Sequence, residues 1–162
     1  MVKRLKNFPF VSVLLFLFSA FLLWRVSVLK EYEAFAMDIL HRVPAPLVLS
    51  SVGRGTHIVY VQPPTACIVA PEEWRKLTSH PATVLVLPHK DAEESRKWLK
   101  SMRYRGKVVL DTGEVFLKLF EVFGVKQPPL KLVVRDGRIV FYEAGPSDGS
   151  TVLRAYHFYS RR

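Results

Sequence analysis

The chain has 162 residues, of which 49% are apolar and 12% aromatic. This length suits one domain of ordinary size plus an appendage, and the apolar share excludes a mostly disordered chain. The single cysteine excludes an internal disulfide, a multi-cysteine zinc site and a dithiol redox centre within one chain.

Positive charge is concentrated near the N-terminus. The chain has 24 Lys+Arg and 14 Asp+Glu, a formal net charge of +10. Residues 1–30 hold five basic residues and no acidic ones, so residues 31–162 hold 19 basic and 14 acidic residues, a net of +5. The five are Lys3, Arg4, Lys6, Arg25 and Lys30. A balance this mild does not indicate nucleic-acid binding, and we expect no nucleic-acid partner.

The N-terminal segment has the length and composition of a membrane anchor. Asn7–Trp24 is a run of 18 uncharged residues, and apolar residues continue beyond Arg25. About 20 apolar residues are needed to cross the hydrocarbon core. We therefore predict a single transmembrane helix, an uncleaved signal anchor, within residues 1–30.

The basic residues before this span set the expected orientation. The positive-inside rule keeps Lys3, Arg4 and Lys6 in the cytoplasm and exports the rest of the chain. The alternative is a cleaved signal peptide and a secreted domain, but the A-x-A sequence at residues 34–36 lies too far downstream of the apolar run. In both cases the soluble domain is extracytoplasmic.

Residues 31–46 are expected to form a stalk or linker, helical until Pro44 and Pro46 end the helix. Residues 47–162 form the soluble domain. Strands are predicted at 47–50, 57–61, 82–87, 107–110, 130–134 and 138–142, and helices at 71–79, 91–104, 114–123 and 150–159. The early strands alternate with helices and should be parallel. The last two strands flank Asp136-Gly137, the signal of an antiparallel hairpin.

Three segments of the domain resemble the thioredoxin-fold superfamily, in particular its membrane-anchored redoxin (TlpA-like) members. A β-rich run, His57–Val61, leads into a loop holding Cys67, at the place where these proteins put a nucleophilic cysteine before a helix. Residues 109–125 resemble the family's strand, Asp, turn and helix that ends in Phe-Gly-Val. Residues 125–139 resemble its cis-proline segment, where a proline precedes a strand, an Asp-Gly turn and the final strand.

The resemblance implies an α/β fold: a thioredoxin-like sandwich with a central mixed sheet, a C-terminal β-hairpin and flanking helices. It makes Cys67 the candidate nucleophile. Counting back from Gly137, it makes Pro129 the candidate cis-proline, with Pro128 as the fallback. In the family this proline packs against the sulfur and shapes a groove for an extended peptide. The implied partner is a protein thiol or peptide in that groove.

The motif around the cysteine departs from the family. The usual C-x-x-C reads Cys67-Ile68-Val69-Ala70, so Ala70 stands where the resolving cysteine would be. Ala66 replaces the tryptophan that commonly precedes the first cysteine. Peroxiredoxins place a threonine three residues before the cysteine, whereas Thr65 lies two before it. Thr65 is kept as a third candidate site residue.

Two interpretations of Cys67 remain open. At a helix N-terminus, unpaired N–H groups and the helix dipole would stabilise a thiolate. The apolar residues Ile68 and Val69 instead favour a buried, inert cysteine. The first interpretation predicts a thiol-disulfide oxidoreductase, or a one-Cys redoxin, that lacks a resolving cysteine. The second predicts a catalytically inactive binding or assembly module that uses the groove near Pro129 and Gln127.

Other candidate features are weaker. The five histidines lack the spacing of helical metal ligands, and we expect no metal and no cofactor. Asp111 is expected to cap the turn that follows it. The helix after Asp91 carries a basic strip, interpreted as a solvated face or as a surface for anionic lipid headgroups. The strip consists of Arg96, Lys97, Lys100, Arg103, Arg105 and Lys107. A transporter subunit is not supported, because the uncharged run holds no ionisable residue.

Overall fold

A computed structural model describes residues 8–42, 52–68 and 70–161. The elements are α1 (Phe8–Arg42), β1 (Thr56–Val61), α2 (Pro71–Thr78), β2 (Thr83–Pro88), α3 (Ala92–Ser101), β3 (Lys107–Asp111), α4 (Val115–Val122), β4 (Leu130–Arg135), β5 (Arg138–Ala144) and α5 (Ser150–Ser160). These agree with the predicted elements in type and order. The strand expected at 47–50 and the linker residues 43–46 lie outside the described residues.

The strands form one mixed sheet in the order β3-β2-β1-β4-β5. β1, β2 and β3 are parallel, and β4 is antiparallel to both β1 and β5. Asp136 and Gly137 join β4 to β5 and have φ values of 49° and 79°. A two-residue turn with both φ angles positive matches the right-handed twist of its flanking strands. The predicted parallel strands and C-terminal hairpin are therefore confirmed.

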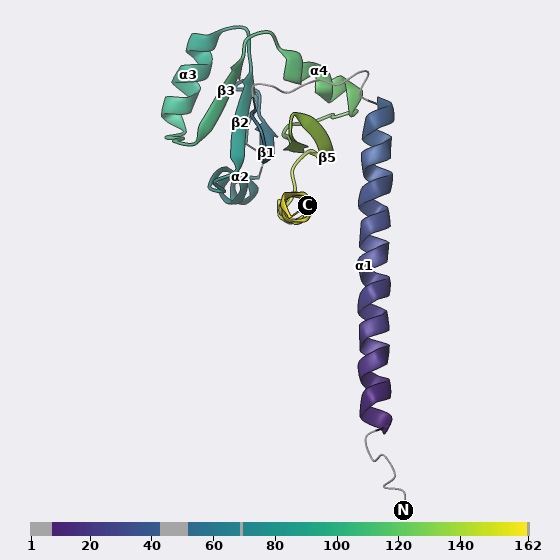
Figure 1. The fold of residues 1–162 in the computed structure, drawn as a ribbon. Coiled ribbons are helices and arrows are strands. Elements are labelled where there is room, and N and C mark those ends of the chain that lie inside the picture. Colours follow the sequence, from purple (N-terminus) through teal and green to yellow (C-terminus); the bar gives the residue numbers. More distant parts are fainter. Residues whose placement is uncertain (1–7, 43–51, 69, 162) are drawn as a thin grey trace, which may run out of the picture.

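Helices cover both faces of the sheet, so each face has its own apolar core (Figure 1). One core joins the alternate residues Val59 and Val61 of β1 to Phe116 and Leu119 of α4. The other joins Ile58 and Tyr60 to apolar residues of α2 and α5, and Trp98 of α3 packs against it. The central strands β1, β2 and β4 are buried on both faces, which explains their nearly continuous apolar sequences.

Helix α3 ends before the predicted boundary at Tyr104. Asp91 caps its N-terminus as expected, accepting hydrogen bonds from the backbone N–H groups of Glu93 and Glu94. At the other end, the N–H of Tyr104 donates to the carbonyl of Leu99, and that of Arg103 to the carbonyl of Lys100. This is a Schellman motif with Arg103 in the left-handed region at φ 51°. Glycine normally takes this position, so the sequence did not signal the earlier end.

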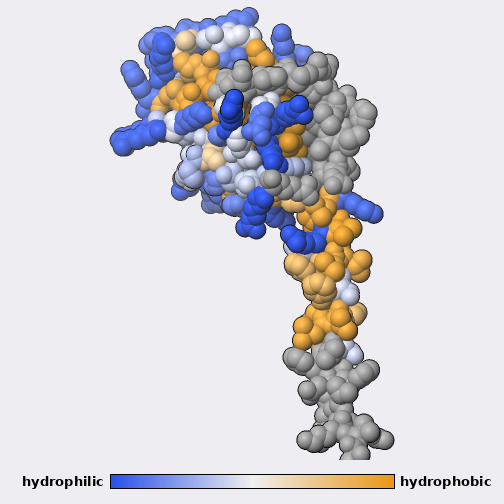
Figure 2. All heavy atoms as spheres, viewed as in Figure 1, coloured by the Kyte–Doolittle hydropathy of each residue, from blue (hydrophilic) through white to orange (hydrophobic). Residues whose placement is uncertain are grey.

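Helix α1 continues without a break through the predicted span and through the predicted stalk as far as Arg42. Its segment Ser12–Lys30 is long and apolar enough to cross a membrane and is not buried within the structure. Phe16 and Leu23 are 73% and 72% exposed, which is unusual for large apolar side chains in water. Helix α1 contacts β5 and extends well beyond the domain (Figure 1), and Figure 2 shows the hydrophobic surface of this extension.

Candidate functional site

The loop that holds Cys67 and the segment that holds Pro129 lie at the same end of the sheet. In the antiparallel β1–β4 pair, Val61 is the partner of Leu130. The chain leaves β1 after Val61 into the Cys67 loop, and it enters β4 at Leu130 directly after Pro129. The peptide bond between Pro128 and Pro129 is cis, and Pro129 is buried. The fold therefore places the two candidate residues on adjoining connections.

Cys67 is exposed in the structure, so a buried, inert cysteine is not supported. It lies in the loop before α2, whose cap is Ala70 and whose first residue is Pro71. The helix dipole acts within about the first turn, so Cys67 lies outside the position at which α2 would stabilise a thiolate. The neighbouring Ile68 packs against the core between the sheet and α2, and thereby fixes the loop without covering the sulfur.

The buried side chain of Gln62 supports the backbone of the Cys67 loop. Its side chain is 1% exposed, and its Nε2 donates to the carbonyl of Ala66 at 3.1 Å. The N–H of Ala66 donates in turn to the carbonyl of Pro63 at 3.0 Å. These bonds hold the backbone directly before Cys67. Thr65 lies in the same turn with its side chain exposed.

A buried ion pair joins α2 to β4 beside this loop. Lys131 Nζ lies 2.9 Å from Glu73 Oε2, and both side chains are fully buried. Lys131 Nζ also donates to the carbonyl of Gly145 at 2.6 Å and lies 3.6 Å from Glu143 Oε2. Buried charges are tolerated when they are paired and hydrogen-bonded. The pair thus fixes the first turn of α2 against the strand that follows Pro129.

Ser147 and Tyr60 complete the coordination of the Glu73 carboxylate. The backbone N–H and the hydroxyl of Ser147 both donate to Oε2, the latter at 2.7 Å. The Tyr60 hydroxyl donates to Oε1 at 3.2 Å. Burial and the nearby Glu73 charge raise the pKa of Tyr60 far above its usual value, so this hydroxyl remains a hydrogen-bond donor at all ordinary pH values.

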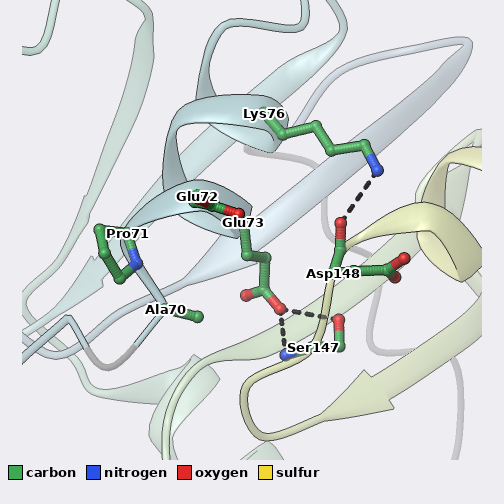
Figure 3. A pocket seen from close by; sticks show the side chains of 7 residues that line it. All are labelled: Ala70, Pro71, Glu72, Glu73, Lys76, Ser147 and Asp148. Carbon is green, nitrogen blue, oxygen red and sulfur yellow. Dashed lines mark hydrogen bonds between the residues drawn. The ribbon is translucent and has the colours of Figure 1, made fainter.

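A hollow of about 480 Å³ lies between the N-terminus of α2 and the segment that leads into α5 (Figure 3). Glu73 and Ser147 line it, and Lys76 closes one side by donating to the carbonyl of Asp148 at 3.0 Å. Cys67 is not among its lining residues. Sequence reasoning missed this cluster. The only signal was Lys131 in the otherwise apolar residues 130–134.

The remaining candidates have structural roles. Asp111 caps the next turn as predicted, because its Oδ2 accepts a hydrogen bond from the N–H of Phe116 at 2.7 Å. His89 lies 3.4 Å from Glu94. His57 is within hydrogen-bond distance of the carbonyl of Arg54, at 2.8 Å. Within the described residues, no three His, Cys, Asp or Glu side chains form a group that could hold a metal ion.

Comparison with known proteins relates the chain to others through structure alone. No protein-family model and no curated protein matches the sequence. A putative thioredoxin from Neisseria meningitidis superposes with a TM-score of 0.51 at 15% identity, over 70% of this chain and 79% of that one. A thiol-disulfide isomerase from Corynebacterium glutamicum gives 0.52 at 11% identity, over 70% and 86%. The thioredoxin domain of a Bacteroides vulgatus thiol-disulfide oxidoreductase gives 0.50 at 15%, over 67% and 83%. Identities this low establish the fold alone, which is thioredoxin-like.

Proposed function

We propose, from this thioredoxin-like fold and the exposed Cys67, that the protein is a membrane-anchored thiol-disulfide exchange protein with one working cysteine. The observation that carries the proposal is the exposure of Cys67 in the connection beside the cis Pro128–Pro129 bond. An exposed thiol at this end of the sheet is accessible to a disulfide of another protein. Structurally similar proteins that are named thioredoxin or thiol-disulfide isomerase support the same chemistry.

The proposed location follows from α1. In this proposal, its apolar segment Ser12–Lys30, which is long and apolar enough to cross a membrane, anchors the chain. The basic residues Lys3, Arg4 and Lys6 precede this segment, so the N-terminus stays in the cytoplasm and the domain is extracytoplasmic. Disulfides form and persist in that kind of compartment, so partner disulfides are available there.

The reaction is a single exchange step. The Cys67 thiolate attacks one sulfur of a partner disulfide, and a Cys67–partner disulfide forms as the partner's own S–S bond breaks. The other partner sulfur leaves as a thiolate and takes up a proton. Ala70 cannot resolve the mixed disulfide. A second thiol, from the partner or from a separate dithiol reductant, must therefore attack it and release Cys67.

Pro129 and its neighbours position the partner in this proposal. Pro129 is buried, whereas Gln127, two residues before it, and Thr65, in the loop that holds Cys67, are exposed. An extended partner segment placed between these two connections would present its disulfide to Cys67. Thr65 would offer a hydroxyl to that segment, which makes it a positioning residue and leaves Cys67 as the only nucleophile.

The absence of a resolving cysteine leads to a specific prediction. With a disulfide-bonded peptide as substrate, the detergent-solubilised full chain should accumulate a mixed disulfide, visible on a non-reducing gel and by mass. An Ala70→Cys variant restores C-x-x-C and should accumulate much less of it, because the introduced thiol would release the peptide and leave an intramolecular disulfide. The mass of the product distinguishes the two results.

The control is the double variant Cys67→Ser/Ala70→Cys, which has a single cysteine at position 70 in place of the one at position 67. If this double variant forms the mixed disulfide as fast as the natural chain, Cys67 has no special role and the proposal fails. If the natural chain forms none, the exchange function is likewise excluded.

A second candidate function is a binding module without chemistry. It is favoured by Ala70 at the resolving position and by the location of Cys67 ahead of α2. It predicts that Cys67→Ser retains partner binding while changes at Gln127 or Pro129 abolish it. The exchange function predicts that Cys67→Ser removes every covalent complex.

A further inference from the structure

The C-terminal end of α2 meets α5 on one face of the sheet. Near the start of α5, Lys76 Nζ donates to Ser150 Oγ at 2.8 Å. Further along, the ring of His80, just after α2, packs edge-on against Tyr156 at 4.9 Å between centroids. Leu77 belongs to the same buried cluster as residues of α5. The end of α2 and the segment after it therefore adjoin the side of α5.

The exposed side of α5 is basic. Arg154, His157 and Arg161 are exposed and follow one another at spacings of three and four residues, which places them on one side of α5. We call these three residues the α5 patch. The exposed acid at the start of the helix, Asp148, caps α5 through the N–H of Ser150 and faces Lys76, which offsets its charge.

Helix α5, which carries the patch, is on the side of the domain toward which the apolar part of α1 extends (Figure 1). Helix α1 contacts the edge strand β5, and from there its apolar segment extends past the level of α2 and α5 (Figure 1). Helices α3 and α4 lie at the opposite side of the domain in the same view. A membrane around Ser12–Lys30 would therefore lie nearest to α2 and α5.

We infer that the α5 patch docks on the anionic lipid headgroups of the membrane that holds α1. The anchor keeps the patch at a high effective concentration next to the headgroups, so weak electrostatic attraction is sufficient. The basic strip of α3 carries more charge, but it is on the far side of the domain and cannot reach this membrane while α1 stays beside β5. The inference requires α1 to span and does not depend on the chemistry of Cys67.

The size of the effect follows from the number of charges. Each Lys or Arg close to an anionic surface shifts the binding equilibrium by about fivefold. Removing both Arg154 and Arg161 should therefore lower the docked-to-free ratio by roughly 25-fold. Because the Debye length falls from about 10 Å at 0.1 M salt to about 3 Å at 1 M, high salt should release the domain.

The test uses the full chain in lipid nanodiscs, with Cys67→Ser and Ser160→Cys to attach an environment-sensitive fluorophore at the exposed end of α5. In discs of equal parts phosphatidylglycerol and phosphatidylcholine, the emission should shift to the blue and be quenched by brominated lipids. Discs of phosphatidylcholine alone should give neither effect. Added salt should reverse both effects in the anionic discs.

Arg154→Gln/Arg161→Gln should lose the quenching, and the matched control Arg96→Gln/Lys100→Gln on α3 should retain it. Equal quenching in neutral and anionic discs, or equal loss in the α3 control, would overturn the inference. The salt dependence of the unsubstituted patch gives the same answer without any change to Arg154, His157 or Arg161, so a folding defect in the double variant cannot hide the result.

Discussion

Lys131→Met is expected to lower the free energy of unfolding by about 3–5 kcal/mol, the usual cost of removing one partner of a buried ion pair. The methionine would fill most of the space but would leave the Glu73 carboxylate buried without a cation. Glu73 would retain only neutral donors, from Ser147 and Tyr60. Urea unfolding of the detergent-solubilised chain, followed by circular dichroism, measures the change.

Two variants show whether this loss comes from the uncompensated charge. Lys126 is exposed, so Lys126→Met should change stability by no more than about 0.5 kcal/mol. Adding Glu73→Gln to Lys131→Met removes the unpaired charge and should restore a large part of the stability. A loss below about 1 kcal/mol for Lys131→Met alone would show that Lys131 does not hold the Glu73 charge.

Trp74→Ala is expected to lower the free energy of unfolding by a similar amount, about 3–5 kcal/mol. Trp74 is 8% exposed and anchors α2 against both the sheet and α3. Its ring meets Tyr60 at 5.4 Å and Trp98 at 5.7 Å between centroids, both edge-on. Such aromatic pairs add about 0.5–1.5 kcal/mol beyond the buried area. The same urea titration measures the effect.

The comparison variant is Trp98→Ala, because Trp98 shares the edge-on contact but is only half-buried. It should cost clearly less than Trp74→Ala. Equal losses would mean that the contact between the two rings, rather than the position of Trp74 under α2, supplies the stability. That result would contradict the assignment of Trp74 as the anchor of the helix that follows Cys67.

The order of strands and helices could be predicted because local sequence determines it. Apolar runs such as residues 82–87 mark strands buried on both faces, and Asp136-Gly137 marks the hairpin. Gly124 likewise marks the end of α4, where it has a φ of 62°. The end of α3 was missed because Arg103 takes a left-handed conformation that only tertiary context makes favourable.

The site was predicted less well than the fold because its contacts are distant in sequence. Glu73 and Lys131 are 58 residues apart, and each alone has an ordinary interpretation as a helix N-terminal acid or a strand lysine. The exposure of Cys67 also could not be predicted, since its neighbours Ile68 and Val69 are apolar. In the structure Ile68 packs inward while Cys67 remains exposed, a division that residue type does not determine.

The most direct test of the proposed exchange compares two reactions of Cys67 in the detergent-solubilised chain. One is mixed-disulfide formation with a disulfide-bonded peptide, and the other is alkylation by iodoacetamide, which reports access to the thiol alone. The ratio of the two rates is measured for the folded chain and for the same chain unfolded in urea. We predict a higher ratio in the folded state, because the connection at Pro129 holds the peptide next to Cys67. A ratio equal to or below that of the unfolded chain, or no reaction of the folded chain with either reagent, would contradict a working thiol at this site.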